Sequence, residues 1–415
     1  MNHNGKNQQT GHLKKKKKKS LIEKFHPGLK KMCVSARENV LQEMDNIRWS
    51  KLRTIFLFIG FVLYLMDIGT DICLVLNCIK DGQYLWGGMT MMFVLTGTLS
   101  TQPFSYAWYR DDAGKAETLK AGVTALHMFG LGTIYRYYHL LKESWRVLRK
   151  TANSPPAEGT EKDHDHLFCM AADLCMLKVF EAFLESVPQL LLQVCIIQSQ
   201  TETSFFRWLS VAFSLINVAH TLMDYSSYLR RSLPHVRGMP SLPSRGVYLL
   251  YKFFTLTSCI LSYSLLITVS VYSTAVLTVL WLLLTVWVHF LKTNFCTSRA
   301  LEFFYRAIVG AILVFTFFNV KGQDTKPAMT VYYILHAIIN ITAPILSVFL
   351  VPDLQGCRFV WTAGLIGGTT ILGFMCLILY YSCLHPKGIQ QEADEVDGLE
   401  TEAMATRKMR SFLQP

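Results

Sequence analysis

Long apolar runs separated by short polar segments dominate the sequence between Thr54 and Leu384. Several runs reach eighteen residues or more, the length that a helix needs to cross the hydrocarbon core of a bilayer. The pattern predicts an all-α polytopic membrane protein of about ten hydrophobic helices. The polar segments 142–166 and 229–245, which contain several arginines, are predicted to be cytosolic loops. The predicted helices cover residues 54–79, 84–109, 118–141, 167–198, 204–228, 246–271, 274–292, 302–320, 329–351 and 358–384.

Two of the predicted helices are less apolar than the others. The stretch 118–141 contains His127 and Arg136, and the stretch 167–198 is interrupted by charged residues and by Pro188. Either helix is therefore expected to enter the bilayer only partly, buried against the rest of the protein.

Positive charge is concentrated at the N-terminal end. Of the net charge of +12, residues 1–53 carry 14 Lys and Arg against 4 Asp and Glu, and they include the run Lys14–Lys19. In a soluble protein this run would suggest nucleic-acid binding, but beside membrane helices the positive-inside rule places it in the cytosol. An even number of helices returns the C-terminus to the same side. We therefore expect a basic cytosolic tail (1–53), a transmembrane helical domain (54–384) and a cytosolic C-terminal regulatory tail (385–415).

Charged residues within the apolar helices are the main candidates for a functional site. They are Asp67, Asp71, Arg136, Lys178, Glu181, Glu185, Asp224 and Arg306. A charge at mid-membrane costs roughly 2.5–3.5 kcal/mol on insertion scales, so the carboxylates should meet Arg136, Lys178 or Arg306 inside the bundle. The spacing places Asp67 and Asp71 on one helix face, and Lys178, Glu181 and Glu185 on one stripe of another. Two interpretations stay open: a buried ion-pair network that fixes helix register, or a polar path for a charged headgroup or ion.

Other chemistry finds little support in the sequence. Paired carboxylates also suit Ca²⁺, which needs several oxygen ligands, but the basic neighbours disfavour this site, and we expect no metal and no other cofactor. The eleven cysteines show no CxxC pair and no metal-binding spacing. No glycine-rich phosphate loop, GxSxG or HExxH motif occurs. We therefore expect neither an enzyme nor an ATP-driven transporter.

A protease motif lies in the polar segment after the last apolar run. Asp394, Glu395, Val396, Asp397 and Gly398 form the preferred substrate of an executioner caspase, whose P1 pocket holds an aspartate through bidentate arginine contacts. We expect cleavage after Asp397. The residues beyond it mix apolar and basic side chains, enough for a short amphipathic segment docked on the cytosolic face, and cleavage would release that segment. The apolar residues assigned to this autoinhibitory tail are Leu399, Met409, Phe412 and Leu413. A tail with no docked state is the alternative.

Several segments together resemble the XK-related family. They are Asp67–Asp71, Gly82–Trp86, Lys178–Leu190, Phe304–Arg306, Phe315–Gln323 and the caspase motif. The resemblance covers about residues 52–415, and it implies a phospholipid scramblase with eight membrane-crossing and two partially inserted helices. Caspase-activated members of this family expose phosphatidylserine on dying cells. By position, the resemblance implies that Asp67, Asp71, Glu181 and Glu185 belong to an intramembrane charge cluster and that Trp86 gates the lipid path.

The partners expected for such a protein are the phospholipids of the plasma membrane, phosphatidylserine among them, and an executioner caspase. A homodimer or an accessory membrane subunit is a further candidate, and no nucleic acid is expected. A passive channel or an ion-coupled solute transporter would share nearly all of these features and stays as the alternative. A membrane adaptor for another lipid transporter is a third.

Overall fold

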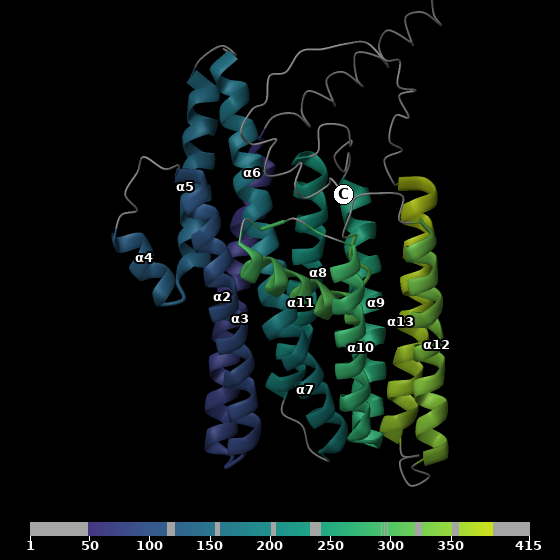
Figure 1. The fold of residues 1–415 in the computed structure, drawn as a ribbon. Coiled ribbons are helices and arrows are strands. Elements are labelled where there is room, and N and C mark those ends of the chain that lie inside the picture. Colours follow the sequence, from purple (N-terminus) through teal and green to yellow (C-terminus); the bar gives the residue numbers. More distant parts are fainter. Residues whose placement is uncertain are drawn as a thin grey trace, which may run out of the picture. The chain divides into compact units, whose positions relative to one another are not determined.

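The computed structural model describes residues 49–113, 121–153, 158–200, 205–232, 242–319 apart from 292, 294 and 297, 326–350 and 357–384. The chain divides into two units, Met1–Ser50 and Lys51–Pro415. In the described part of the second unit, all regular structure is helical (Figure 1).

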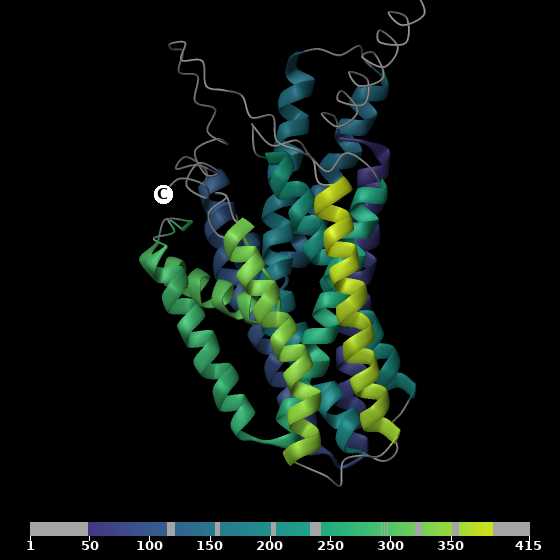
Figure 2. The same cartoon turned by 90° about the vertical axis from the view of Figure 1, so that its right-hand side faces the viewer.

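Long helices of similar direction make up most of this unit (Figures 1 and 2). The helices are α2 (Lys51–Lys80), α3 (Tyr84–Ala113), α4 (Ala121–Met128), α5 (Gly132–Asn153), α6 (Glu158–Glu181), α7 (Val187–Ser199), α8 (Phe205–Ser232), α9 (Leu242–Val269), α10 (Tyr272–Phe290), α11 (Arg299–Phe315), α12 (Lys326–Leu350) and α13 (Cys357–Leu379), with π-helical segments η1 (Ala182–Ser186) and η3 (Tyr380–Leu384). Among the described residues, α2, α8, α9, α10, α12 and α13 are long and apolar enough to cross a membrane. The predicted all-helical, multi-pass membrane architecture is thus confirmed in its coarse form.

The predicted helix 118–141 is two helices in the structure. Helix α4 ends at Met128 and α5 begins at Gly132, and between them Gly130 has a φ of 76°. This left-handed backbone conformation strongly favours glycine. The chain therefore reverses at a point where its apolar composition suggested a continuous helix.

The segment 142–166, predicted to be a cytosolic loop, is mostly helical in the structure. Helix α5 continues to Asn153, and α6 already starts at Glu158. The many polar residues of this stretch belong to an amphipathic helix whose inner face buries Leu140, Ser144 and Val147. Figure 1 shows α5 and α6 lying side by side as a helical hairpin.

The predicted helix 167–198 is continuous in direction but not in hydrogen bonding. The π-helical segment η1 joins α6 to α7 at Ala182–Ser186, and Pro188 follows at the start of α7. Proline lacks the backbone N–H that would bond to Leu184, so the α-helical ladder cannot run through this point. Short π-helical segments inside helices are frequent at functional sites.

Helix α11 differs most from the predicted span 302–320. It has 17 residues, about 25 Å of helix, and Figure 1 shows it running across the long helices beside it. Helix α10 packs on α11. Only 6% of the most apolar stretch of α10 is buried in the protein. By contrast, α9 contacts α7, α8, α12 and α13 and lies at the centre of the helices around it.

Candidate functional site

Five of the predicted charged residues are buried together where α2, α6, η1 and α8 meet. Asp67 and Asp71 come from α2, Lys178 and Glu181 from the end of α6, and Glu185 from η1; each is at most 9% exposed. The spacing argument therefore predicted correctly that these two stripes face the interior.

Asp67 is held by neutral donors. The Oγ of Ser186 donates to Oδ2 at 3.1 Å, and the Nδ2 of Asn217 donates to the same oxygen at 2.9 Å. The Oγ of Ser214 donates to Oδ1 at 3.0 Å. Three such bonds replace much of the hydration that a carboxylate loses on burial, so Asp67 needs no basic partner in contact with it.

Asp71 and Glu185 approach each other. The Nε2 of Gln189 donates to Oδ1 of Asp71. A Cβ at Gly97 of α3 would lie 2.4 Å from both Cβ and Oε2 of Glu185. The pair is therefore enclosed by α3 on one side.

Lys178 is the one basic residue that the structure brings to these carboxylates among the residues it describes. Its Nζ lies 5.4 Å from the ring centre of Tyr64 and 5.7 Å from that of Tyr137. The hydroxyl of Tyr64 donates to Oε1 of Glu181 at 3.1 Å. The ammonium is thus stabilised by two aromatic faces as well as by the neighbouring carboxylates.

Asp224 lies beside this group and pairs with other residues. Its Oδ1 accepts from Arg245 at 3.2 Å, and its Oδ2 is 3.3 Å from Nδ1 of His220. A cavity of about 10 Å³ joins Asp224 to Lys178 and Thr221. That volume holds about one water molecule.

Arg136 lies elsewhere in the bundle. Its Nε and Nη2 donate to Oγ and the carbonyl oxygen of Ser105, both at 2.9 Å, and Nη1 is 3.6 Å from Asp173. Among the described contacts, its ionic partner is therefore Asp173 and none of the four clustered carboxylates.

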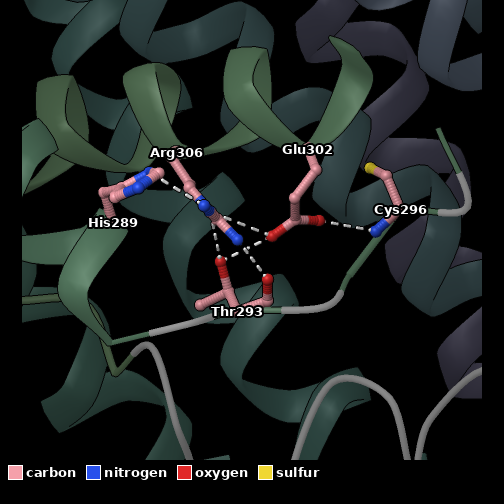
Figure 3. Close-up of polar contacts among 5 residues, drawn as sticks. All are labelled: His289, Thr293, Cys296, Glu302 and Arg306. Atoms are coloured by element: carbon pink, nitrogen blue, oxygen red, sulfur yellow. Dashed lines mark hydrogen bonds and ion pairs between the residues drawn. The ribbon is translucent and has the colours of Figure 1, made fainter. Parts of the chain in front are cut away.

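Arg306 belongs to a separate polar group at the start of α11 (Figure 3). It contacts Oε1 of Glu302 at 3.2 Å, Oγ1 of Thr293 at 3.1 Å and Nδ1 of His289 at 2.9 Å. The second oxygen of Glu302 accepts from the backbone N–H of Cys296 at 2.7 Å. This group fastens the α10–α11 connection to the first turn of α11 and takes no part in the central cluster.

Trp86 is half-buried in the first turn of α3. It precedes Gly97 by eleven residues on the same helix, about 16 Å along its axis. Its carbonyl oxygen accepts from Oγ1 of Thr90 at 3.0 Å. Trp86, the predicted gate residue, therefore lies on a helix that borders the charge cluster, about three turns from the point where that helix meets Glu185.

Neutral polar residues complete the site, and they were not among the residues predicted from the sequence. Ser186, Ser214 and Asn217 bind Asp67, whereas Gln189 binds Asp71. Glutamine at 189 and 193 continues the four-residue spacing of Glu181 and Glu185, which is the signal that could have revealed them.

The remaining predicted residues fall outside the described part of the chain. They are the caspase motif Asp394, Glu395, Val396, Asp397 and Gly398, and the tail residues Leu399, Met409, Phe412 and Leu413. Within the described ranges, no three His, Cys, Asp or Glu residues are placed to hold a metal ion.

Comparison with known proteins gives one consistent result. A family profile for XK-related protein matches residues 55–386. The chain is 46% identical to XK-related protein 9 of Tetraodon nigroviridis over 88% of this chain and 99% of the relative. It is 27% identical to XK-related protein 8 of Pan troglodytes over 82% of this chain and 86% of the relative, and 27% identical to XK-related protein 8 of Tetraodon nigroviridis over 80% and 83%. The chain belongs to the XK-related protein family.

Proposed function

We propose that this protein is a phospholipid scramblase of the plasma membrane that exposes phosphatidylserine on apoptotic cells. One observation carries the proposal: four carboxylates and a lysine are buried together between helices of a multi-pass membrane protein. Intramembrane ionisable residues are rare, and they commonly mark a substrate path. Family membership supports the same activity.

The mechanism needs no covalent chemistry. A headgroup that crosses hydrocarbon must shed its water at a high cost in free energy. Polar and charged side chains along a furrow replace that water while the acyl tails stay in lipid. Tyr64, Asn217 and Gln189 already bind carboxylates in the cluster, and these are groups that could exchange partners with a headgroup.

Regulation enters through the C-terminal tail. An executioner caspase would cut after Asp397 on the cytosolic side, and residues 399–415 would leave. The sequence motif supports this step. A single chain, a homodimer and a complex with an accessory subunit are all compatible with this mechanism.

The proposal predicts lipid flipping by the purified chain that ends at Asp397. In liposomes with a fluorescent lipid, a membrane-impermeant quencher added outside should remove about half of the fluorescence without this chain and nearly all of it with the chain, because flipping brings inner-leaflet lipids to the outer leaflet. Replacing Glu181 and Glu185 with Gln should slow flipping, because the altered charges face the path. Lys80→Gln at the exposed end of α2 is the matched control and should flip lipid normally.

The same vesicles distinguish the alternatives. A passive channel or ion-coupled transporter has equal use for buried charges, and it would give ion flux without lipid flipping. Inactivity in both measurements would favour a membrane adaptor. Normal flipping by a well-folded Glu181→Gln/Glu185→Gln chain would remove these two residues from the mechanism.

A further inference from the structure

A line of buried polar side chains continues from the charge cluster along α6, η1 and α7. Glu181, Glu185, Gln189 and Gln193 recur every four residues, and each is at most 6% exposed. Lys178 precedes them. From Lys178 to Gln193 the line covers 16 residues, about 22 Å of helix against a hydrocarbon core of about 30 Å.

Several atoms along this line and on the neighbouring helix α8 have no hydrogen-bond partner among the described residues. They are Oε2 of Glu181, Oε2 of Glu185, Oε1 of Gln189, both amide atoms of Gln193, Oδ1 of Asn217 and Oγ1 of Thr221. Buried polar groups without partners are rare because each costs about 1–3 kcal/mol. Gln193 is the clearest case, since its whole amide is unpaired within the described part of the chain and only 2% of the residue is exposed.

The spacing of these groups suits water as the missing partner. Residues four apart are about 6 Å apart along a helix axis, and one water that binds two oxygens spans about 5.6 Å. The cavity beside Lys178, Thr221 and Asp224 has room for about one such molecule, and the unpaired Oγ1 of Thr221 lines it. The spacing along the helix therefore matches the distance that one bridging water spans.

We propose that this line is a hydrated file that conducts protons through the bundle. The file contains two titratable carboxyl groups, Glu181 and Glu185, each with one buried oxygen that has no partner among the described residues. Chains of Asp and Glu inside membranes serve as proton relays. In each hop a water or carboxyl O–H bond breaks on one side as another forms on the other, and the O–H groups then rotate back before the next proton passes. Four carboxylates face one lysine here, which favours cationic over anionic occupants.

The proposal goes beyond lipid scrambling and is tested with the full chain. Purified protein is reconstituted into phosphatidylcholine liposomes that contain a pH-sensitive dye, and a potassium gradient with valinomycin drives proton entry. We expect faster internal acidification than in protein-free liposomes. Gln193→Leu should abolish most of this flux, because an apolar side chain of similar size interrupts the file. Gln193→Glu should retain it, because a carboxyl group still binds water.

Two further variants make the result specific. Thr221→Val keeps the shape but removes a hydroxyl that lines the one-water cavity, and it should reduce the flux. Gln198→Leu is the matched control: the amide of Gln198 is already paired with Ser264 and Thr268, and its removal should leave proton flux unchanged. Thermal unfolding of Gln193→Leu should show an intact fold, because the substitution removes an unpaired amide.

Two outcomes would overturn the file. One is acidification no faster than in protein-free liposomes, and the other is equal flux in Gln193→Leu and the unchanged chain. Lipid flipping by the chain ending at Asp397 is measured separately. Absence of flipping with proton flux present would therefore count against the scramblase proposal and leave the file in place.

Discussion

Position 97 shows how much the site depends on one missing side chain. Helix α3 packs against η1 at this position, and the side chain of Glu185 occupies the space that a Cβ at residue 97 would need. Close approach of this kind is a use that only glycine allows.

Gly97→Ala should therefore destabilise the protein. The new methyl group would lie 2.4 Å from Cβ of Glu185, and because Cβ is fixed to the backbone, α3 or η1 must move. Overpacking of this size costs about 1–3 kcal/mol, so thermal unfolding of the detergent-purified protein should occur at a lower temperature. Gly88→Ala on the same helix meets nothing within 4 Å and serves as control. Equal unfolding temperatures for the two variants would contradict this role of Gly97.

Some residues of the site were predictable from sequence and others were not. Asp67, Asp71, Lys178, Glu181 and Glu185 stand out because charge inside an apolar helix is costly and must face inward. Ser, Thr and Asn are common in membrane helices, where their side chains often bind the backbone of the same helix. Whether such a residue binds a charged group therefore depends on which helix lies opposite, and the packing of the helices is seen only in the structure.

At the scale of elements, α11 is fixed at both ends by buried polar contacts. Glu302 and Arg306 fasten its first turn. At its other end, Nζ of Lys252 from α9 donates to Oγ1 of Thr316 at 3.0 Å and to the carbonyl oxygen of Phe317 at 3.1 Å. The carbonyl end of a helix carries partial negative charge, so an ammonium group there is favourable.

Lys252→Met should release this end of α11. Methionine retains the length and apolar stem of lysine but donates no hydrogen bond. The free energy of unfolding is a poor readout, because removal of a buried charge offsets the lost bonds. Backbone hydrogen exchange is the informative measurement, and it should speed up over residues 313–319. Lys80→Met, at an exposed position, should exchange normally there. Unchanged exchange in Lys252→Met would show that α11 is held by packing alone.

Hydropathy predicted where the helices lie in the sequence better than it predicted how they are oriented and what surrounds them. The spans 246–271 and 274–292 correspond closely to α9 and α10, because both are strongly apolar, with Lys252 as the one Lys, Arg, Asp or Glu in the first of them. The segment 302–320 is equally apolar, yet α11 runs across its neighbours (Figure 1). A helix enclosed by protein and a helix surrounded by lipid meet the same requirement for apolar side chains, so composition does not separate them. The α4–α5 break occurs where Gly130 has a φ of 76°, a conformation that apolar composition does not reveal.

For the whole molecule, the proposed switch lies beyond the last described helix. The π-helical segment η3 ends at Leu384, and its carbonyl oxygen accepts from Oγ of Ser244 at 3.2 Å. The end of the helical domain is therefore tied to the start of α9, the helix that also contacts α7.

Asp397→Ala should block phosphatidylserine exposure in dying cells. The caspase pocket recognises an aspartate carboxylate at this position, and alanine offers none. Annexin binding to intact cells is the measurement, with surface expression determined in parallel. Glu400→Ala, three residues along the same tail and outside the motif, should leave exposure unchanged. Normal exposure by Asp397→Ala would reject the cleavage switch.

The π-helical segment η1 has a consequence for the permitted length of the chain. A π-helical turn closes i→i+5 bonds and so holds one residue more than an α-helical turn. Deleting one residue within 182–186 would therefore let this segment close as an α-helix, with the directions of α7 and Gln189 nearly unchanged. A chain one residue shorter here should accordingly keep the packing of α7, whereas a single deletion within the α-helical part of α6 would turn its residues by about 100°.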